Sequence, residues 1–499
     1  MDGEISAVGG PELPAREIVD ATGLTVAPGF IDAHTHADLA IAKDTETDCF
    51  VYQGVTSCIC GNCGFSAFPL LGGGREAHLR YAAGVMGPYN SADGWASFSE
   101  YADAISGKMR LNMACFAGHG ALRASVMGGG DQHPNAAQIA AECALLDRQL
   151  TQGALGLSLG LIYSPGSTAE REEFLSLAKV VRRHDGILAV HLRDEGAALP
   201  DSMEEIFSIA RETGVRVELS HHKVMGIRNW GLSRTSLALA CRARREGLRV
   251  GLDAYPYNAG CSTGLVLLPP WALSDGAEHT MELLSDEVSL ERMEHDLETG
   301  LPGWENLSAS CTWDNLIFAS LASGDKTVLG RSIADLGRKW GCTSLRALAR
   351  VLLQEHGAVS VSIRGMDLED VNRILTSELT VLGSDGLFSA ECAHPRRYGA
   401  FAHFYREYAH AGCMRPEEVI AKMTGKTAEA FGLRGRGFIR PGCRADLAIF
   451  KANTFRDLAD FSDPQRLAVG MEYVFVNGQA VLHNGVKIDA RPGQVLKSN

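Results

Sequence analysis

The stretch VAPGFIDAHTHAD, Val26 to Asp38, contains the features that decide the fold. A short apolar run, GFI, leads into His34 and His36, two histidines separated by one residue. In an extended strand, residues i and i+2 point to the same side, so both imidazoles can face one point. Imidazole is the commonest protein ligand for metals. The pattern predicts half of a metal site at the end of a buried strand, and an ordinary polar loop is the alternative.

Beyond this stretch, short apolar runs alternate with helical patterns. Several of these runs lack polar alternation, as is typical of parallel strands buried on both faces. Repeated strand–helix–strand units predict a parallel sheet with crossover helices, and eight strands predict a closed (β/α)₈ TIM-like barrel, an α/β fold, over residues 28–432. The eight expected strands are Gly29–His36, Val55–Asn62, Asn112–Gly118, Ala154–Gly160, Ile187–Arg193, Arg216–Lys223, Arg249–Tyr255 and Thr380–Asp385.

Three helices have readable boundaries. Ser167 with Glu170, and Ser202 with Glu205, have the spacing of capping boxes and predict two helix starts, the second helix ending at Gly214. A third helix is expected over Ser233 to Arg245.

Two other regions differ in sequence pattern from the predicted barrel. Residues 263–378, between the seventh and eighth strands, are too long for a loop and predict an inserted subdomain near the mouth of the site. Residues 433–499 contain short strands with Gly and Asn turns, and Asn477-Gly478 predicts a hairpin. With residues 1–27 they are expected to form a small β-sandwich built from both chain ends.

Composition limits the class of partner. The chain has 499 residues, 45% of them hydrophobic, and a net charge of −13, which argues against nucleic acid and against anionic membrane surfaces. The opening MDGEISAVGG has no signal-peptide features, and no apolar run approaches the ~20 residues of a membrane span. Thirteen cysteines fit reduced thiols better than a disulfide framework. We expect a cytoplasmic monomer or small homo-oligomer that binds a small molecule.

Polar side chains fall where the predicted strands end. In a (β/α)₈ barrel the functional residues lie at the carboxyl ends of the strands. Each such residue alone is more often structural, but their joint placement predicts a metal-dependent site. After His34 and His36, the strand-end residues are Cys63, His191, His221, His222, Lys223, Asp253, Tyr255, Tyr257 and Asp385.

Cys60 and Cys63 form a C-x-x-C pair, which has two other interpretations. Such a pair can be a redox motif or half of a zinc ribbon. The sequence has no second C-x-x-C, and no helical pattern opens at Cys63. We expect Cys58 and Cys60 to pack within the strand.

The motifs together resemble the N-acyl-D-amino-acid deacylases (D-aminoacylases) of the amidohydrolase superfamily. The resemblance covers nearly the whole chain and rests on HTHAD, GNCGF, GHGALR, GLSLGLIYSPG, HLRDEG, SHHK with NWG, DAYPY, GSDG, HPRRYG and GRGFIRPGCRADLAIF. It implies zinc-dependent hydrolysis of the amide bond of N-acyl-D-amino acids, giving a carboxylate and a free D-amino acid.

The resemblance also implies the metal ligands. Cys63, His191 and His221 would hold a tight zinc. His34, His36 and Asp385 would flank a second, weaker site, with Cys63 able to bridge the two. Many binuclear relatives bridge their metals with a carboxylated lysine on the fourth strand, but no lysine occurs between Lys108 and Lys179. A thiolate is a strong zinc ligand and can replace it.

The same resemblance assigns the roles around the substrate. Asp385 would accept the proton of the attacking water and deliver it to the leaving amine. Lys223 and Arg396 would bind the substrate α-carboxylate, with Tyr255 beside them. The pattern departs from the family in NAGCST, where Cys261 leaves a carboxylate contact from Ser262 open.

Two other functions compete with this interpretation. A cyclic-amide hydrolase of hydantoinase or dihydroorotase type could use the same barrel and metals. The missing fourth-strand lysine and the HPRRYG motif argue against it. A non-catalytic scaffold is the second alternative, and the full set of candidate ligands argues against that.

Overall fold

The eight predicted barrel strands are present in their predicted order, the third being divided in two. The structure is a computed structural model, and it describes residues 3–10, 15, 17–43, 47–128, 133–274, 276–389 and 394–498. The barrel strands are β2 (Phe30–Asp32), β3 (Val55–Cys60), β4 (Asn112–Cys115), β5 (Ala117–Gly118), β6 (Gly156–Gly160), β7 (Ile187–His191), β8 (Arg216–Leu219), β9 (Val250–Ala254) and β13 (Thr380–Leu382).

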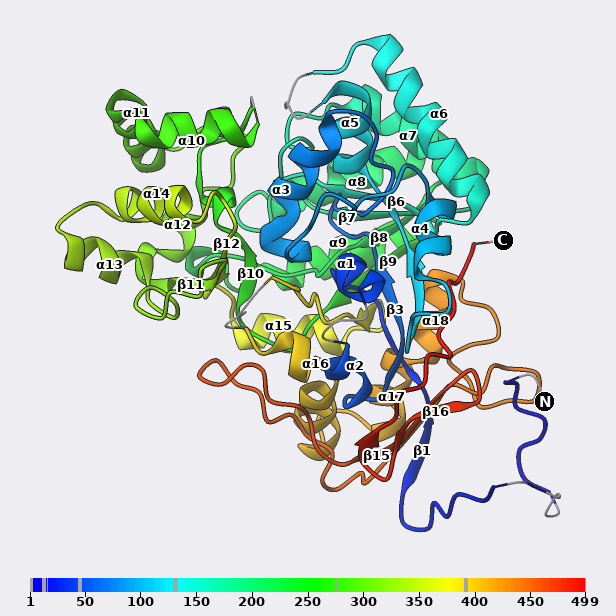
Figure 1. The fold of residues 1–499 in the computed structure, drawn as a ribbon. Coiled ribbons are helices and arrows are strands. Elements are labelled where there is room, and N and C mark those ends of the chain that lie inside the picture. Colours follow the sequence, from blue (N-terminus) through cyan, green and yellow to red (C-terminus); the bar gives the residue numbers. More distant parts are fainter. Residues whose placement is uncertain are drawn as a thin grey trace.

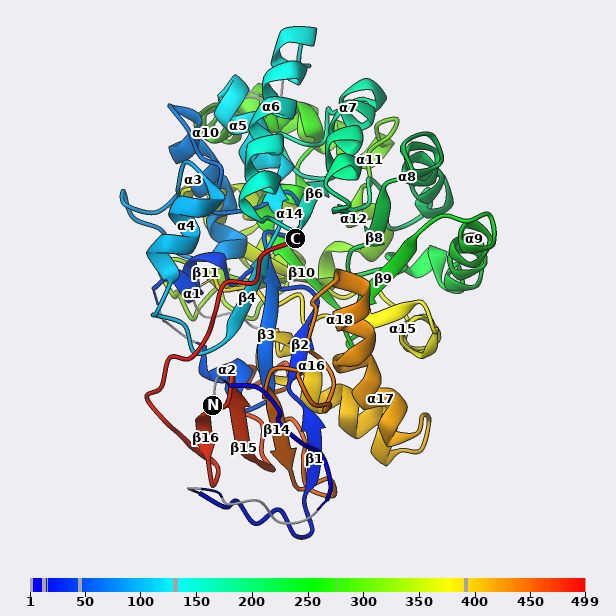
Figure 2. The ribbon, with the colours of Figure 1, turned by 90° about the vertical axis from the view of Figure 1, so that its right-hand side faces the viewer.

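These strands close into a ring of parallel neighbours. Their orders are β2-β3-β4 and β5-β6-β7-β8-β9-β13, and only Phe116 separates β4 from β5. On the other side, Ala33 N donates to Leu382 O over 3.2 Å, which joins the first strand to the last. The predicted (β/α)₈ barrel is therefore confirmed (Figures 1 and 2).

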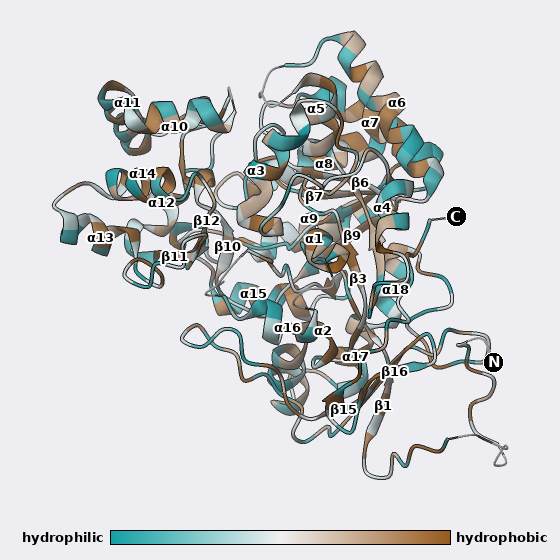
Figure 3. Ribbon diagram, viewed as in Figure 1, coloured by the Kyte–Doolittle hydropathy of each residue, from teal (hydrophilic) through white to brown (hydrophobic). Residues whose placement is uncertain are grey.

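The barrel helices cover the outside of this ring, and hydrophilic and hydrophobic residues alternate along them (Figure 3). Every residue of β3, β6 and β7 is buried, as their apolar sequences predict. The helices are α1 (Asp38–Ala42), α2 (Asp48–Val51), α3 (Gly74–Met86), α4 (Phe98–Ile105), α5 (His119–Met127), α6 (Ala136–Gln152), α7 (Arg171–Arg183), α8 (Leu199–Thr213), the 3₁₀ turn Ile227–Asn229, α9 (Ser233–Arg245), α15 (Leu368–Thr376), α16 (Arg396–Phe404), the π-helix Tyr405–His410, α17 (Pro416–Met423) and α18 (Gly425–Phe431).

Both predicted capping boxes are wrong, whereas the third helix is confirmed. Helix α7 begins after Glu170 with no side-chain cap, and α8 begins after Ala198. Gly214 ends α8 with a φ of 71°, as predicted. Within the described ranges, no helix combines the length and apolar character that crossing a bilayer requires.

The segment between β9 and β13 carries its own sheet and helices. Its three antiparallel strands lie in the order β10-β12-β11, and its helices extend to one side of the barrel (Figure 1). Helix α15, at the C-terminal end of this segment, packs against α9 and so belongs to the layer of helices around the barrel. The elements of the segment are β10 (Gly260–Thr263), 3₁₀ turns Gly264–Leu267, Pro270–Leu273 and Trp313–Asn315, α10 (Ala277–Ser285), α11 (Glu287–Thr299), α12 (Leu307–Cys311), β11 (Leu316–Leu321), α13 (Ile333–Trp340), α14 (Ser344–Gln354) and β12 (Val359–Ile363).

A small β domain combines both chain ends. Its five-stranded antiparallel sheet has the order β1-β14-β15-β16-β17, and β1 pairs with β14. Its strands are β1 (Thr25–Pro28), β14 (Leu447–Phe450), β15 (Met471–Val476), β16 (Gln479–His483) and β17 (Val486–Lys487). The hairpin at Asn477-Gly478 is confirmed, since both residues adopt the positive φ values, 48° and 78°, that a tight hairpin turn needs.

A buried ionic network connects three of the helices that surround the barrel strands. His119 Nε2 on α5 lies 2.5 Å from Glu173 Oε1 on α7, and Arg123 Nε lies 3.8 Å from the same oxygen. Burial and the neighbouring Glu173 raise the pKa of Glu142, on α6, to about 8. Because Arg123 supplies a positive charge, this His–Glu–Glu cluster does not need a metal ion.

We predict that Arg123→Met lowers the free energy of unfolding by about 3 kcal/mol or more, because it removes the guanidinium charge that the buried Glu173 carboxylate faces and leaves His119 as its remaining partner. Arg148→Met, at an exposed position of α6, is the matched control and should change stability by less than ~0.5 kcal/mol. Urea denaturation followed by circular dichroism measures both. Equal midpoints for the two variants would contradict a structural role for this network.

Candidate metal centre

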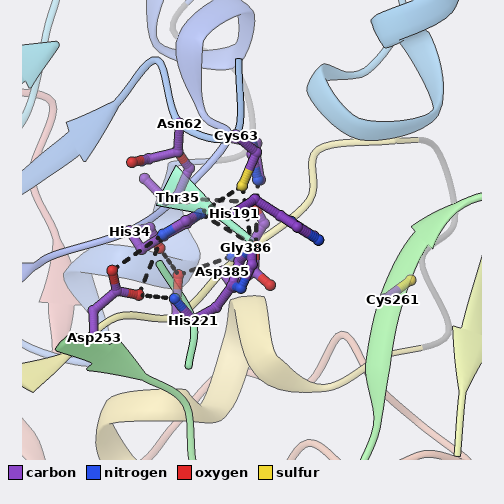
Figure 4. Close-up of polar contacts among 12 residues, drawn as sticks. His34, Thr35, Asn62, Cys63, His191, His221, Asp253, Cys261, Asp385 and Gly386 are labelled. Carbon is purple, nitrogen blue, oxygen red and sulfur yellow. Dashed lines mark hydrogen bonds and ion pairs between the residues drawn. The ribbon is translucent and has the colours of Figure 1, made fainter. Parts of the chain in front are cut away.

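The predicted ligands converge because all of them lie at or just beyond the carboxyl ends of barrel strands (Figure 4). His191 is the last residue of β7, while Cys63, His221 and Asp385 lie two or three residues beyond the ends of β3, β8 and β13. All of these side chains are buried.

His34 and His36 meet for a different reason from the one the sequence suggested. Strand β2 ends at Asp32, so the H-x-H motif lies beyond the strand rather than within it. A parallel bridge between Thr35 and Gly386 keeps the motif extended. The two imidazole rings lie 5.4 Å apart, and their Nε2 atoms are 3.6 and 3.3 Å from Asp385 Oδ1.

Two groups of potential ligand atoms share one thiol. Cys63 groups with His191 and His221, and also with His34 and His36; within each group the donor atoms lie within 4.8 Å of one another. Cys63 Sγ is 3.2 Å from His221 Nε2 and 3.4 Å from His34 Nε2. This arrangement suits a bridging thiolate between two metal ions.

The electrostatics of this centre fit a cation. Both ring nitrogens of His191 are buried without a hydrogen-bond partner, a costly arrangement unless a lone pair binds something. Burial lowers the pKa of His191 well below its usual value, so the ring is neutral, the form that binds metal. Burial raises the pKa of the Cys63 thiol to about 11, and a bound cation would reverse this by favouring the thiolate. Sulfur and imidazole donors together suit zinc.

Two acids that sequence reasoning did not assign orient the histidines. Asp253 Oδ1 lies 3.2 Å from His34 Nδ1 and accepts a hydrogen bond from His221 N over 2.8 Å. Glu195 Oε1 lies 3.2 Å from His221 Nδ1. A histidine that binds metal through Nε2 carries its proton on Nδ1, and both carboxylates are placed to accept that proton. Both acids lie in motifs noted in the sequence: Glu195 in HLRDEG and Asp253 in DAYPY.

Lys223, Tyr255 and Arg396 gather beside the ligands, as predicted. The Tyr255 ring lies 5.9 Å from Lys223 Nζ and 5.0 Å from Arg396 Cζ. Each cation is paired with a carboxylate of the chain: Lys223 Nζ donates to Glu195 over 2.7 Å, and Arg396 Nη1 donates to Asp385 over 2.7 Å. Burial raises the pKa of Tyr255 to about 12, which keeps the phenol protonated and able to donate.

Three of the converging residues adopt left-handed backbone conformations. Cys63, His221 and Asp385 have φ values of 55°, 36° and 50°, respectively. Such conformations are uncommon for residues other than glycine and cluster at functional sites. Here they turn each side chain back over the mouth of the barrel.

Several other residues of the sequence motifs lie outside the ligand cluster. His222 Nε2 contacts Ser236 Oγ at 2.9 Å, and Arg193 pairs with Glu205. Cys58 and Cys60 pack within β3, as expected, and Figure 4 shows Cys261 apart from the ligand cluster. Residues 390–393, just before HPRRYG, lie outside the described residues.

Thiol and imidazole groups at the carboxyl ends of a (β/α)₈ barrel define a barrel protein built to bind metal. More specifically, the chain belongs to the amidohydrolase family, whose model matches residues 17–278 and 347–482. The stretch between the two matched ranges falls within the segment between β9 and β13.

Relatives of known activity match almost the whole chain and confirm the resemblance to the N-acyl-D-amino-acid deacylases. D-aminoacylase from Alcaligenes xylosoxydans xylosoxydans is 35% identical over 99% of this chain and 91% of its own length. The crystal structure of N-acyl-D-glutamate deacylase from Bordetella bronchiseptica, complexed with zinc and a phosphonate inhibitor, has a TM-score of 0.83 at 32% identity and covers 99% of this chain and 94% of that one. A D-hydantoinase structure, at 14% identity and a TM-score of 0.54, covers 100% and 94% and shares the fold alone.

Proposed function

We propose that the protein is a zinc-dependent N-acyl-D-amino-acid deacylase, which hydrolyses the amide bond to a carboxylate and a free D-amino acid. Cys63, His191 and His221 would hold the tight zinc, and His34, His36 and Asp385 would form a weaker second site. The observation that carries the proposal is the buried His191, whose two ring nitrogens have no hydrogen-bond partner, grouped with the Cys63 thiol and His221. The 35% identity to a D-aminoacylase supports the choice of reaction. The cytoplasmic location expected from the sequence belongs to the same proposal.

Asp385 is the residue proposed to move protons. Although burial alone would raise the pKa of Asp385, the Arg396 guanidinium holds it well below its usual value, so the carboxylate is ionised and can accept a proton. A zinc ion at this centre supplies polarisation of the acyl oxygen and a lower pKa for a bound water. Asp385 takes the proton of the attacking water and then gives it to the leaving amine.

Lys223, Tyr255 and Arg396 are proposed to bind the α-carboxylate. A guanidinium can bind a carboxylate through two parallel hydrogen bonds, which fixes its orientation. With the carboxylate fixed at one end and the acyl group at the ligand cluster, the two remaining substituents of Cα point in set directions. Only one enantiomer then directs its side chain into free space.

The direct experiment compares parental enzyme on N-acetyl-D-leucine, N-acetyl-L-leucine and hydantoin, with and without a chelator. We expect hydrolysis of the D-substrate alone, lost on chelation and restored by zinc. Hydantoin turnover without deacylation would instead identify a cyclic-amide hydrolase, and no turnover at all would favour a scaffold.

We predict that Cys63→Ala loses most of its zinc and nearly all activity, because it removes a ligand from both groups of donors. Cys58→Ala, within β3, is the matched control and should retain the metal. Elemental analysis of the purified proteins measures the zinc. A full complement in Cys63→Ala would disprove this ligand assignment.

We predict that Asp385→Asn keeps the tight zinc, whose three ligands remain, but lowers kcat by at least ~10²-fold, the low end for a general acid–base group. Asp463→Asn, at an exposed loop position, should have parental kinetics. Steady-state rates and zinc content are measured on the same preparations. Parental turnover in Asp385→Asn would rule out the proton transfer.

We predict that Arg396→Met lowers kcat/KM roughly 10- to 100-fold, because a charge-assisted hydrogen bond contributes on the order of 1.5–3 kcal/mol. Zinc content should stay unchanged, and discrimination between N-acetyl-D- and N-acetyl-L-methionine should narrow. An N-acyl amine without a carboxylate is the control substrate, because Arg396 also contacts Asp385. An equal loss on that amide would show that Arg396 acts on Asp385 or on the fold instead.

A further inference from the structure

A second cavity adjoins the candidate centre and is much larger than it. The cavity over the ligands has a volume of about 40 Å³ and the adjoining one about 430 Å³. They share the side chains of Ile162, Glu305 and Leu307 as a common wall. Small-molecule sites typically have ~300–1,000 Å³. The larger space is therefore of the right size to hold part of a substrate whose reacting amide lies at the ligands.

The larger cavity is lined mainly by apolar and aromatic side chains. They come from the loop after β6 and from the segment between β9 and β13, and they include Leu161, Val266, Leu268, Trp271, Leu301 and Trp304. The Trp271 ring is held in place, since its Nε1 donates to Asp296 Oδ2 over 2.7 Å and the Arg292 guanidinium lies 3.8 Å above it. A large apolar or aromatic group would find a preformed surface here.

The charges around the two cavities disfavour an acidic group. Among the described lining residues, the two permanent cations already have partners: Lys223 pairs with Glu195, and Arg193 donates to Ser167 O over 2.6 Å and pairs with Glu205. Glu305 instead presents a buried Oε1 without a hydrogen-bond partner. Burial raises the pKa of Glu305 well above its usual value, so this carboxyl group is uncharged and supplies no cation. Under the proposed function Lys223 binds the α-carboxylate, and Arg193 is paired with Glu205, so a second substrate carboxylate would find no further cation among the described lining residues.

The position of the shared wall indicates which part of the substrate enters. Glu305 Oε2 accepts a hydrogen bond from Glu195 N over 3.2 Å, and Glu195 in turn binds Lys223 at 2.7 Å. The shared wall therefore lies beside a residue proposed to bind the α-carboxylate. With the carboxylate held there, the side chain on the neighbouring Cα is the substituent nearest to the shared wall.

Resting on the proposed deacylase function, we infer that this cavity binds the side chain of the substrate and selects N-acyl-D-amino acids with large apolar or aromatic side chains over acidic ones. The first test compares parental kcat/KM on N-acetyl-D-tryptophan, N-acetyl-D-alanine and N-acetyl-D-glutamate. We expect the tryptophan substrate to exceed each of the others by roughly 10-fold or more, the scale of discrimination by an apolar pocket.

The second test fills the cavity with Leu301→Trp, and Val288→Trp is the matched control because Val288 is 72% exposed on α11, outside the cavity. The ratio of kcat/KM for the tryptophan substrate to that for the alanine substrate should fall at least ~10-fold in Leu301→Trp and stay parental in the control. Zinc content and the alanine rate report whether the variant is folded.

The outcomes distinguish a failure of this inference from a failure of the proposed deacylase function. If the parental enzyme hydrolyses none of the three substrates, the proposed function fails. If it hydrolyses all three equally well, or if the ratio is unchanged in Leu301→Trp, the side-chain cavity is wrong. If Leu301→Trp loses rate on N-octanoyl-D-alanine but not on N-acetyl-D-tryptophan, the cavity holds the acyl group, and this also overturns the inference.

Discussion

The pairing of Asp32 with Ser384 closes the barrel, and the candidate centre depends on it. Asp32 is fully buried, and its carboxylate accepts hydrogen bonds from Ser384 N at 2.7 Å and Ser384 Oγ at 2.5 Å. Burial raises the pKa of Asp32 to about 7, although these hydrogen bonds favour the ionised form. Leaving such a group unsatisfied costs ~1–3 kcal/mol. The pairing therefore holds the first strand to the last, and Asp385 N donates to His34 O across the same seam over 2.7 Å.

Candidate ligands at the ends of the barrel strands adopt strained backbone conformations, which cost free energy. Left-handed backbone costs ~1–2 kcal/mol for a residue with a side chain, and Cys63, His221 and Asp385 all adopt it. Asp253 offsets part of this at His221 by accepting its N–H, while also contacting the His34 ring. Strain at the ligands is thus tolerated because buried hydrogen bonds around them leave few alternatives.

The sequence predicts the order of the barrel strands well, because that order follows from local apolar patterns. The structure also brings together the candidate ligands that the family resemblance implies. The sequence predicts helix starts poorly where other contacts compete. Ser167 lies in a turn, its N–H donating to Tyr163 O over 2.8 Å, and α7 begins only after Glu170, three residues further along the chain. Asp194 Oδ1 accepts from the N–H groups of Gly196 and Ala198, which allows α8 to begin before Ser202. Glu195 has no recognisable role until the fold brings His221 and Lys223 to it.

The two buried ion pairs explain how a carboxylate-binding site can exist inside the protein. An isolated buried cation would be strongly destabilising, so Lys223 and Arg396 need anionic partners. Glu195 and Asp385 provide them, and under the proposed function both acids also serve the ligands. Lys223 Nζ lies 2.6 Å from His221 Nδ1, but a metal-binding His221 carries its proton on that nitrogen and cannot accept from the ammonium. Metal binding would then leave Lys223 held by Glu195 alone, with donor capacity for a substrate carboxylate. Under the proposed function, shared acids therefore connect the groups that bind metal with those that bind the substrate carboxylate.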